Sequence, residues 1–129
     1  MSPHEFDQTV EWAYSRIPRR FRNRLSNVAL VVEREPSANQ LTQAGVGPGG
    51  TLLGLYQGRP LTSRSVFENF AMPDRITIFQ GPHERLARDE AHLRQMVLDT
   101  VWHEVAHYFG MDEQRVRRAE QRRKTGGRS

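Results

Sequence analysis

The sequence predicts a single small α+β domain, in which helices cover one face of a mixed sheet of three or four strands. Apolar residues recur at helical spacing near both ends of the chain, whereas three short runs between them are rich in β-branched and aromatic residues. This order of helices, strands and helices is typical of a small sheet that buries one face under helices. A chain of 129 residues is long enough for one such core.

The N-terminal part of the chain is predicted to be helical. Residues 4–16 carry apolar side chains three or four positions apart, as an amphipathic helix does. Pro18 suits the first position of a second, shorter helix over residues 18–25, because that position has no helical partner for its N–H group. Two helices therefore precede the first strand.

The middle of the chain alternates strand-like and loop-like segments. The strand-like runs are short and apolar, and residues rich in Gly and Pro separate them; Pro82 closes the last run. The predicted strands cover residues 28–35, 51–58 and 74–82, and the segments between them, 36–50 and 59–73, are predicted to be loops.

A long helix is predicted from Asp89 and Glu90 to Gly110. Glycine takes a left-handed C-terminal turn without steric cost, so we expect the helix to end there. Asp112 can then cap a final helix that runs from Glu113 towards Lys124.

The positive charge is concentrated at the C-terminus. Residues 114–129 hold seven basic residues and one acid, whereas residues 1–113 hold 12 bases and 14 acids. We therefore divide the chain into a domain over residues 1–113 and a basic C-terminal helix or tail over residues 114–129. Such a tail is usually solvated. The alternative is a docking site for nucleic acid or another acidic partner.

Composition excludes several classes of protein and site. The chain has no cysteine, so any metal must be bound by His and carboxylate side chains. The longest apolar run, residues 28–32, is far shorter than the roughly 20 residues of a membrane span, and we expect no membrane partner. Residues 1–14 carry acids where a signal peptide has an apolar segment, so the expected location is the cytoplasm.

The segment "HEVAHYFGMDE", His103 to Glu113, begins with the pattern H-E-x-x-H. Two residues four positions apart on a helix share a face, so His103 and His107 can bind one Zn²⁺ ion. Glu104 lies beside such a metal, where a carboxylate can take a proton from zinc-bound water and pass it to the leaving amine. The residue types and their spacing predict a zinc-dependent hydrolase.

The third metal ligand depends on the path of the chain after Gly110. If the helix continued, residue 113 would lie about 240° around the axis from His107 and face away from the metal. A turn at Gly110 brings Glu113 back towards the metal, and we favour it as the third ligand. Asp112 is the competing candidate, one residue short of the metzincin spacing H-E-x-x-H-x-x-G-x-x-[ligand]. The other histidines, His4, His83 and His92, are expected to be ordinary polar residues.

The chain resembles the small bacterial "minimal zincin" family of metallopeptidases. The similarity rests on "IPRRF", "LSNVALVVEREP", "LLGLYQGRPLTSRSV", "PDRITIFQGP" and "TVWHEVAHYFGMDEQRV", in that order. It implies a minimal zincin-like fold, one zinc bound by His103, His107 and Glu113, Glu104 as general base, and a peptide or protein substrate. The chain is expected to depart from larger zincins, because no methionine follows Met111 in this sequence to form a Met-turn and no C-terminal subdomain is expected to complete the cleft.

Two alternatives remain open. Bacterial ribonucleases that mature ribosomal RNA carry the similar string H-G-x-L-H-L-x-G-Y-D-H, and the basic tail would suit RNA. Against this, Glu104 stands where their motif has Gly, and Glu113 stands where it has the third His. The other alternative is a zinc-binding interaction module without turnover.

Overall fold

The computed structural model describes residues 1–58 and 73–126, with side chains as far as residue 121. The predicted α+β class and the three-stranded mixed sheet are confirmed. The predicted connection 59–73 lies, apart from Pro73, outside the described residues. The elements in chain order are α1 (Pro3–Ser15), α2 (Arg19–Arg22), the 3-10 turn η1 (Asn23–Leu25), β1 (Val28–Glu33), α3 (Ala38–Gln43), β2 (Gly54–Gln57), β3 (Asp74–Phe79), α4 (Gln80–Leu86) and α5 (Glu90–Gly126).

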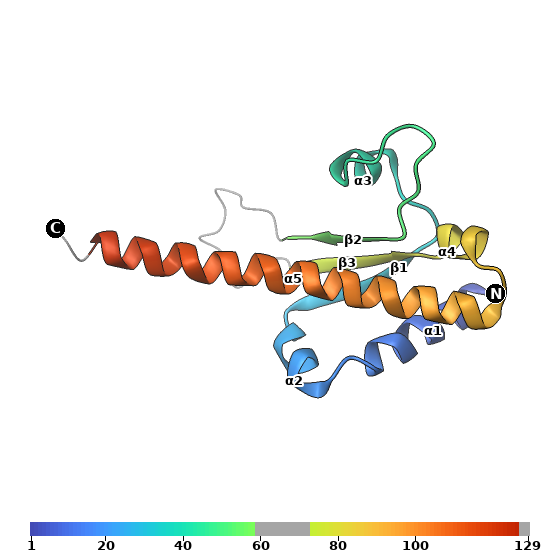
Figure 1. Ribbon diagram of the computed structural model, residues 1–129, viewed down its shortest axis with the longest axis horizontal. Helices are drawn as coiled ribbons and strands as arrows, with labels where there is room; N and C mark the ends of the chain where they lie inside the picture. Colours follow the sequence, from blue (N-terminus) through green and yellow to red (C-terminus); the bar gives the residue numbers. More distant parts are fainter. Residues whose placement is uncertain (59–72, 127–129) are drawn as a thin grey trace.

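The sheet has the strand order β1-β3-β2, so β3 is central and β2 lies at an edge (Figure 1). β3 pairs in parallel with β1, where Val28 is opposite Asp74, and antiparallel with β2, where Gly54 is opposite Ile78. The backbone N–H of Phe79 also donates to the carbonyl of Leu53 at 2.9 Å, which extends the β2 pairing by one residue. The prediction of an edge strand at residues 51–58 is therefore confirmed for Gly54–Gln57, the residues that form β2.

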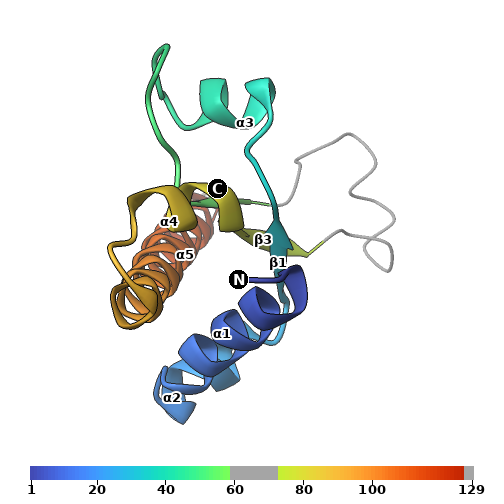
Figure 2. The same cartoon turned by 90° about the vertical axis from the view of Figure 1, so that its right-hand side faces the viewer.

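The core lies between the sheet and two helices, α1 and α5, which run side by side (Figure 2). Alternation along β3 places Ile76 and Ile78 on the helix-facing side, where each is at most 2% exposed. The helices contribute residues at three- and four-residue spacing, as the sequence predicts: Phe6, Val10, Ala13 and Ile17 from α1, and Leu93, Val97, Val101 and Val105 from α5.

Two predictions for the middle of the chain are wrong, one for a loop and one for the end of a strand. Both took no account of local helix capping and packing. The predicted loop 36–50 contains α3, which begins at a capping box in which Ser37 and Gln40 satisfy each other's backbone N–H groups. The predicted strand 74–82 ends at Phe79, and α4 follows directly. Pro82 lies in the first turn of α4, where its missing N–H costs nothing, so it does not mark the end of a strand.

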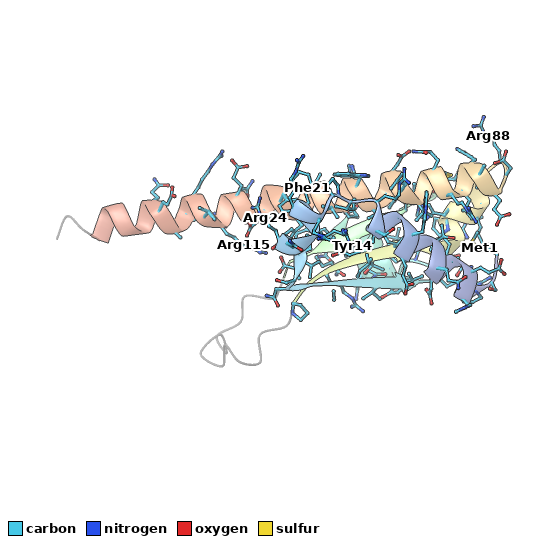
Figure 3. All side chains as sticks on the ribbon, turned by 90° about the horizontal axis from the view of Figure 1, so that it is seen from below. Met1, Tyr14, Phe21, Arg24, Arg88 and Arg115 are labelled. Atoms are coloured by element: carbon cyan, nitrogen blue, oxygen red, sulfur yellow. The ribbon has the colours of Figure 1, made fainter. Side chains whose placement is uncertain are left out.

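The predicted helix end at Gly110 is also wrong, because α5 continues without a break to Gly126. Glycine inside a helix costs only about 1 kcal/mol, and a helix that ended at Gly110 would lose the contacts on its C-terminal side. Arg24 lies 3.4 Å from Asp112, and Arg115 lies 2.9 Å from Asp74. Asp112 is therefore an interior helix residue and does not cap a separate helix. Figure 3 shows Arg24 and Arg115 at the end of the folded body.

Beyond Arg115 the helix projects past the strands and the other helices as a single rod (Figure 1). We call residues 116–126 the C-terminal arm. Every described side chain from residue 116 to 121 is exposed, so this part of the arm adds nothing to the buried core of the described chain. The expected boundary between residues 113 and 114 falls inside α5.

Candidate metal centre

One face of α5 brings together His103, Glu104 and His107, which we call the His–Glu–His cluster. Their potential ligand atoms all lie within 4.8 Å of one another. The two imidazole rings have centroids 4.7 Å apart, as expected for residues one turn apart on a helix. Helical spacing alone therefore produces the convergence that the sequence predicts.

Exposure within the cluster differs between the imidazoles and the carboxylate. The side chain of Glu104 is 5% exposed, whereas that of His107 is 58% exposed. Oε1 of Glu104 lies 3.3 Å from Nδ1 of His107. The carboxylate is thus held beneath two solvent-facing imidazoles.

A cleft of about 450 Å³ lies beside the cluster. One wall is the segment Thr51–Gly54 that leads into β2, and the other is the α5 face that carries His103 and Glu104. The remaining lining residues are Met96, Asp99 and Thr100 from α5. An extended ligand in this cleft would lie next to both the edge strand and the cluster.

Gly54 determines how closely β2 approaches α5. A Cβ atom at this position would lie 2.7 Å from Cγ2 of Thr100 and 3.1 Å from Cγ of Glu104. Both distances are shorter than the roughly 3.5–4.0 Å at which carbon atoms pack best. A glycine inside a short strand often marks a close approach of the backbone to another segment. Gly54 is such a glycine, although the sequence analysis made no prediction from it.

His83 supports the cleft wall from behind and was expected to be an ordinary polar residue. Its ring is fully buried in α4 and packs against Phe6. In the neutral ring, Nδ1–H donates to the carbonyl of Phe79 at 2.7 Å, and Nε2 lies 2.9 Å from the hydroxyl of Thr100. That hydroxyl shares its single hydrogen between Nε2 and the carbonyl of Met96, which is also 2.9 Å away. Burial lowers the pKa of His83, so the ring is neutral near pH 7. His83 thereby fixes Thr100, one turn before Glu104.

A second polar cluster fastens α5 to the sheet at Arg115, just before the C-terminal arm. The hydroxyl of Tyr56 donates to Oδ2 of Asp74 at 2.5 Å, and Arg115 donates to the same carboxylate oxygen at 2.9 Å and to the Tyr56 hydroxyl at 3.0 Å. Asp74 is 1% exposed. Burial, together with the hydrogen bond to Asp74, raises the pKa of Tyr56 to about 12. Tyr56 is therefore a protonated structural donor.

A comparison of the sequence with known protein families agrees with this geometry. The family model of the zincin-like metallopeptidases matches residues 25–123, which include the edge strand and the whole His–Glu–His cluster. The chain belongs to the zincin-like metallopeptidase family. No curated protein matches this zincin-like chain.

A solved structure shares the fold of this zincin-like protein. It is a conserved hypothetical protein from Thermus thermophilus, with a TM-score of 0.64 and 22% sequence identity. The match covers 88% of this chain and 99% of that one. At this identity the comparison shows the fold alone.

The side chains that the zincin-like chain brings together supply part of the ligand set that a zinc ion requires. Imidazole nitrogen and carboxylate oxygen are ordinary zinc ligands, and His103 and His107 converge as a zinc site requires. Glu113 is not brought to them: its side chain is 63% exposed and pairs with Arg117 at 2.5 Å. Because α5 is continuous, Glu113 projects away from His107. The structure thus assembles two of the three expected ligands.

Proposed function

We propose that this protein is a zinc-dependent peptidase in which His103 and His107 bind the metal and Glu104 is the general base. The observation that carries the proposal is the position of Glu104, buried at 5% exposure against His107 in the wall of a cleft. Family membership supports the peptidase class. The substrate is a peptide or protein.

Each polar residue of the cluster has a chemical role in this proposal. Zinc held by His103 and His107 would supply Lewis-acid chemistry, which lowers the pKa of a metal-bound water to about 7. Glu104 then accepts a proton from the attacking water and delivers it to the leaving amine. Its burial restricts the carboxylate to orientations near His107, which keeps the base at the reacting centre.

Glu113 is our proposed third ligand, and its binding requires α5 to end at Gly110. That change would separate Arg115 from Asp74 and Tyr56, and Asp112 from Arg24, since all these contacts belong to the continuous helix. The proposal therefore couples metal binding to the conformation of α5 beyond Gly110.

Substrate is proposed to bind as an additional strand along β2. The support is that β2 lies at the edge of the sheet and leads directly from the cleft. Backbone hydrogen bonds to an edge strand give affinity with little preference for sequence.

The test is a cleavage profile of a peptide library with the zinc-loaded protein and its Glu104→Ala variant. Glu104→Ala should keep the zinc, because Glu104 is not a proposed ligand, and should lower the cleavage rate at least about 100-fold. Glu11→Ala, which removes an exposed acid on α1, is the matched control and should cleave like the wild type. Cleavage by Glu104→Ala at the wild-type rate would remove Glu104 as the base.

Two other outcomes would replace the proposal. Cleavage of structured RNA, with no cleavage of peptides, would assign the cluster to a ribonuclease. Binding of zinc without turnover of either polymer would make the protein a zinc-dependent interaction module.

A further inference from the structure

The cleft beside the His–Glu–His cluster contains a carboxylate that the proposed chemistry does not use. Asp99 lines the cleft from α5, one helical turn before His103. Its exposed side chain accepts a hydrogen bond from Nε2 of Gln95 through Oδ1 at 2.9 Å, and no Lys or Arg among the described residues pairs with it. Asp99 therefore presents a negative charge to a ligand in the cleft.

Every residue that lines this cleft precedes Gly110. The two walls are Thr51–Gly54 and the α5 residues between Met96 and Glu104. A conformation in which α5 ends at Gly110, as zinc binding by Glu113 requires, therefore removes neither wall. The carboxylate of Asp99 faces the ligand whether α5 continues or ends.

The walls around Asp99 are mainly apolar. Leu52, Leu53 and Met96 are half-buried there, and the lining residues include two acids, Asp99 and Glu104, with no Lys or Arg. A long basic side chain packs its methylene stem against such a wall and carries its charged head to a carboxylate. A nucleic acid would instead bring phosphates to two carboxylates. The cleft therefore favours a basic peptide side chain.

The hydrogen bond from Gln95 favours lysine as that side chain. The advantage of arginine at a carboxylate comes from two parallel hydrogen bonds, one to each oxygen. Because Gln95 already donates to Oδ1 of Asp99, Oδ2 is the oxygen without a side-chain donor. A single oxygen suits the compact charge of a lysine ammonium group.

The direction of β2 determines which part of a bound peptide meets Asp99. A Cβ at Gly54 would lie 3.1 Å from Cγ of Glu104. Further along both elements, the rings of Tyr56 and Tyr108 have centroids 6.0 Å apart, so β2 and α5 run in the same direction (Figure 1). Antiparallel pairing is the more stable arrangement per residue. In that arrangement the peptide C-terminal to the scissile bond extends towards Asp99, which precedes Glu104 on α5.

We propose that Asp99 makes the cleft select peptides with a lysine at the first or second residue C-terminal to the scissile bond. The inference rests on the proposed peptidase function. Asp99 lies five residues before Glu104, about 7.5 Å along the helix axis. An extended peptide covers that distance in about two residues at 3.3 Å each, and a long lysine stem also reaches it from the first residue.

The experiment measures binding of fluorescein-labelled peptides to the zinc-loaded, full-length Glu104→Ala protein, in which bound peptide is not consumed. One peptide carries a single lysine in a neutral background. The other carries norleucine at the same position, which keeps the apolar stem and removes the charge. The lysine peptide should bind about two- to fivefold tighter at low salt, as expected for one exposed ion pair. The advantage should disappear in about 0.5 M NaCl.

Matched substitutions at Asp99 locate the effect. Asp99→Asn should remove the preference for lysine while it keeps an oxygen that accepts from Gln95, and Asp99→Lys should turn the preference towards a glutamate peptide. Asp7→Asn removes an exposed acid on α1, outside the cleft, and should keep the lysine preference. Equal binding of the lysine and norleucine peptides would overturn the proposal. So would binding of neither peptide, or a lysine preference that persists in Asp99→Asn.

The cleavage profile of the wild type tests the direction of the peptide. Lysine should be enriched at the first two residues of the C-terminal products, and enrichment on the N-terminal side of the cleaved bond would overturn the proposed direction. If the wild type cleaves peptides with no preference for lysine, the role of Asp99 is wrong and the peptidase function stands. If the lysine peptide binds through Asp99 but the wild type cleaves no peptide, the peptidase function is wrong and the charge preference of the cleft stands.

Discussion

Replacing Gly54 by alanine is expected to separate β2 from the helix that carries Glu104. The added methyl group would lie 2.7 Å from Cγ2 of Thr100, 3.1 Å from Cγ of Glu104 and 3.3 Å from the backbone oxygen of Thr77. None of these atoms is the free end of a flexible side chain. Thr100 is β-branched and is fixed by its hydrogen bond with His83.

The clash must therefore be relieved by movement of β2 or α5. Overpacking of this kind costs about 1–3 kcal/mol in the free energy of unfolding. For a domain of this size that corresponds to roughly 4 °C in Tm per kcal/mol. Movement at this position also shifts Glu104, so the rate of peptide cleavage should fall together with the stability.

Urea denaturation followed by the fluorescence of Trp12 and Trp102 measures the change in stability. Gly47→Ala is the matched control, because a Cβ at Gly47 meets nothing within 4 Å and its φ is not positive. It should be neutral or slightly stabilising, since alanine restricts the unfolded chain. If Gly54→Ala were as stable and as active as Gly47→Ala, the close packing of β2 on α5 would be refuted.

Three further predictions concern Arg115, His83 and Glu113. Arg115→Met should lower the free energy of unfolding by about 1.5–3 kcal/mol, measured by urea denaturation, because it deprives buried Asp74 of a charged donor; an unchanged urea midpoint would contradict this. Burial keeps the pKa of His83 below its unfolded value, so the unfolded chain binds the proton more strongly and stability should fall as pH drops below about 6.5. The fall should be shallower in His83→Gln, and equal slopes in pH-dependent urea titrations would disprove the assignment. Glu113→Gln should sharply reduce bound zinc, measured by elemental analysis, whereas Asp112→Asn should not; the opposite result would move the third ligand to Asp112.

The edge strand and the core were largely predictable because their patterns are local. Alternation in Asp74–Phe79 and three- and four-residue spacing in α1 identify the faces that pack together, and the structure buries those faces. The missed elements, α3 and α4, are only six and seven residues long. Helices of that length depend on a cap or on tertiary packing, which periodicity does not reveal.

The role of His83 was not predictable from sequence. Its partner Thr100 is 17 residues away on another helix, and a lone histidine after Pro82 gives no indication that it is buried. The position of Gly54 against Glu104 is likewise a contact between segments 50 residues apart. Both contacts depend on how α4 and β2 pack on α5, which no local pattern specifies.

The sequence by itself determined the convergence of His103, Glu104 and His107, because residues three and four apart on a helix must share a face. Only the tertiary structure decided the path of the chain beyond Gly110. A glycine permits either a turn or a continued helix, and the difference of about 1 kcal/mol is small. Contacts between Asp112 and Arg24 and between Arg115 and Asp74, 88 and 41 residues apart, favour the continued helix. They carry Glu113 away from the histidines and extend the arm, and a helix that ended at Gly110 would lose them.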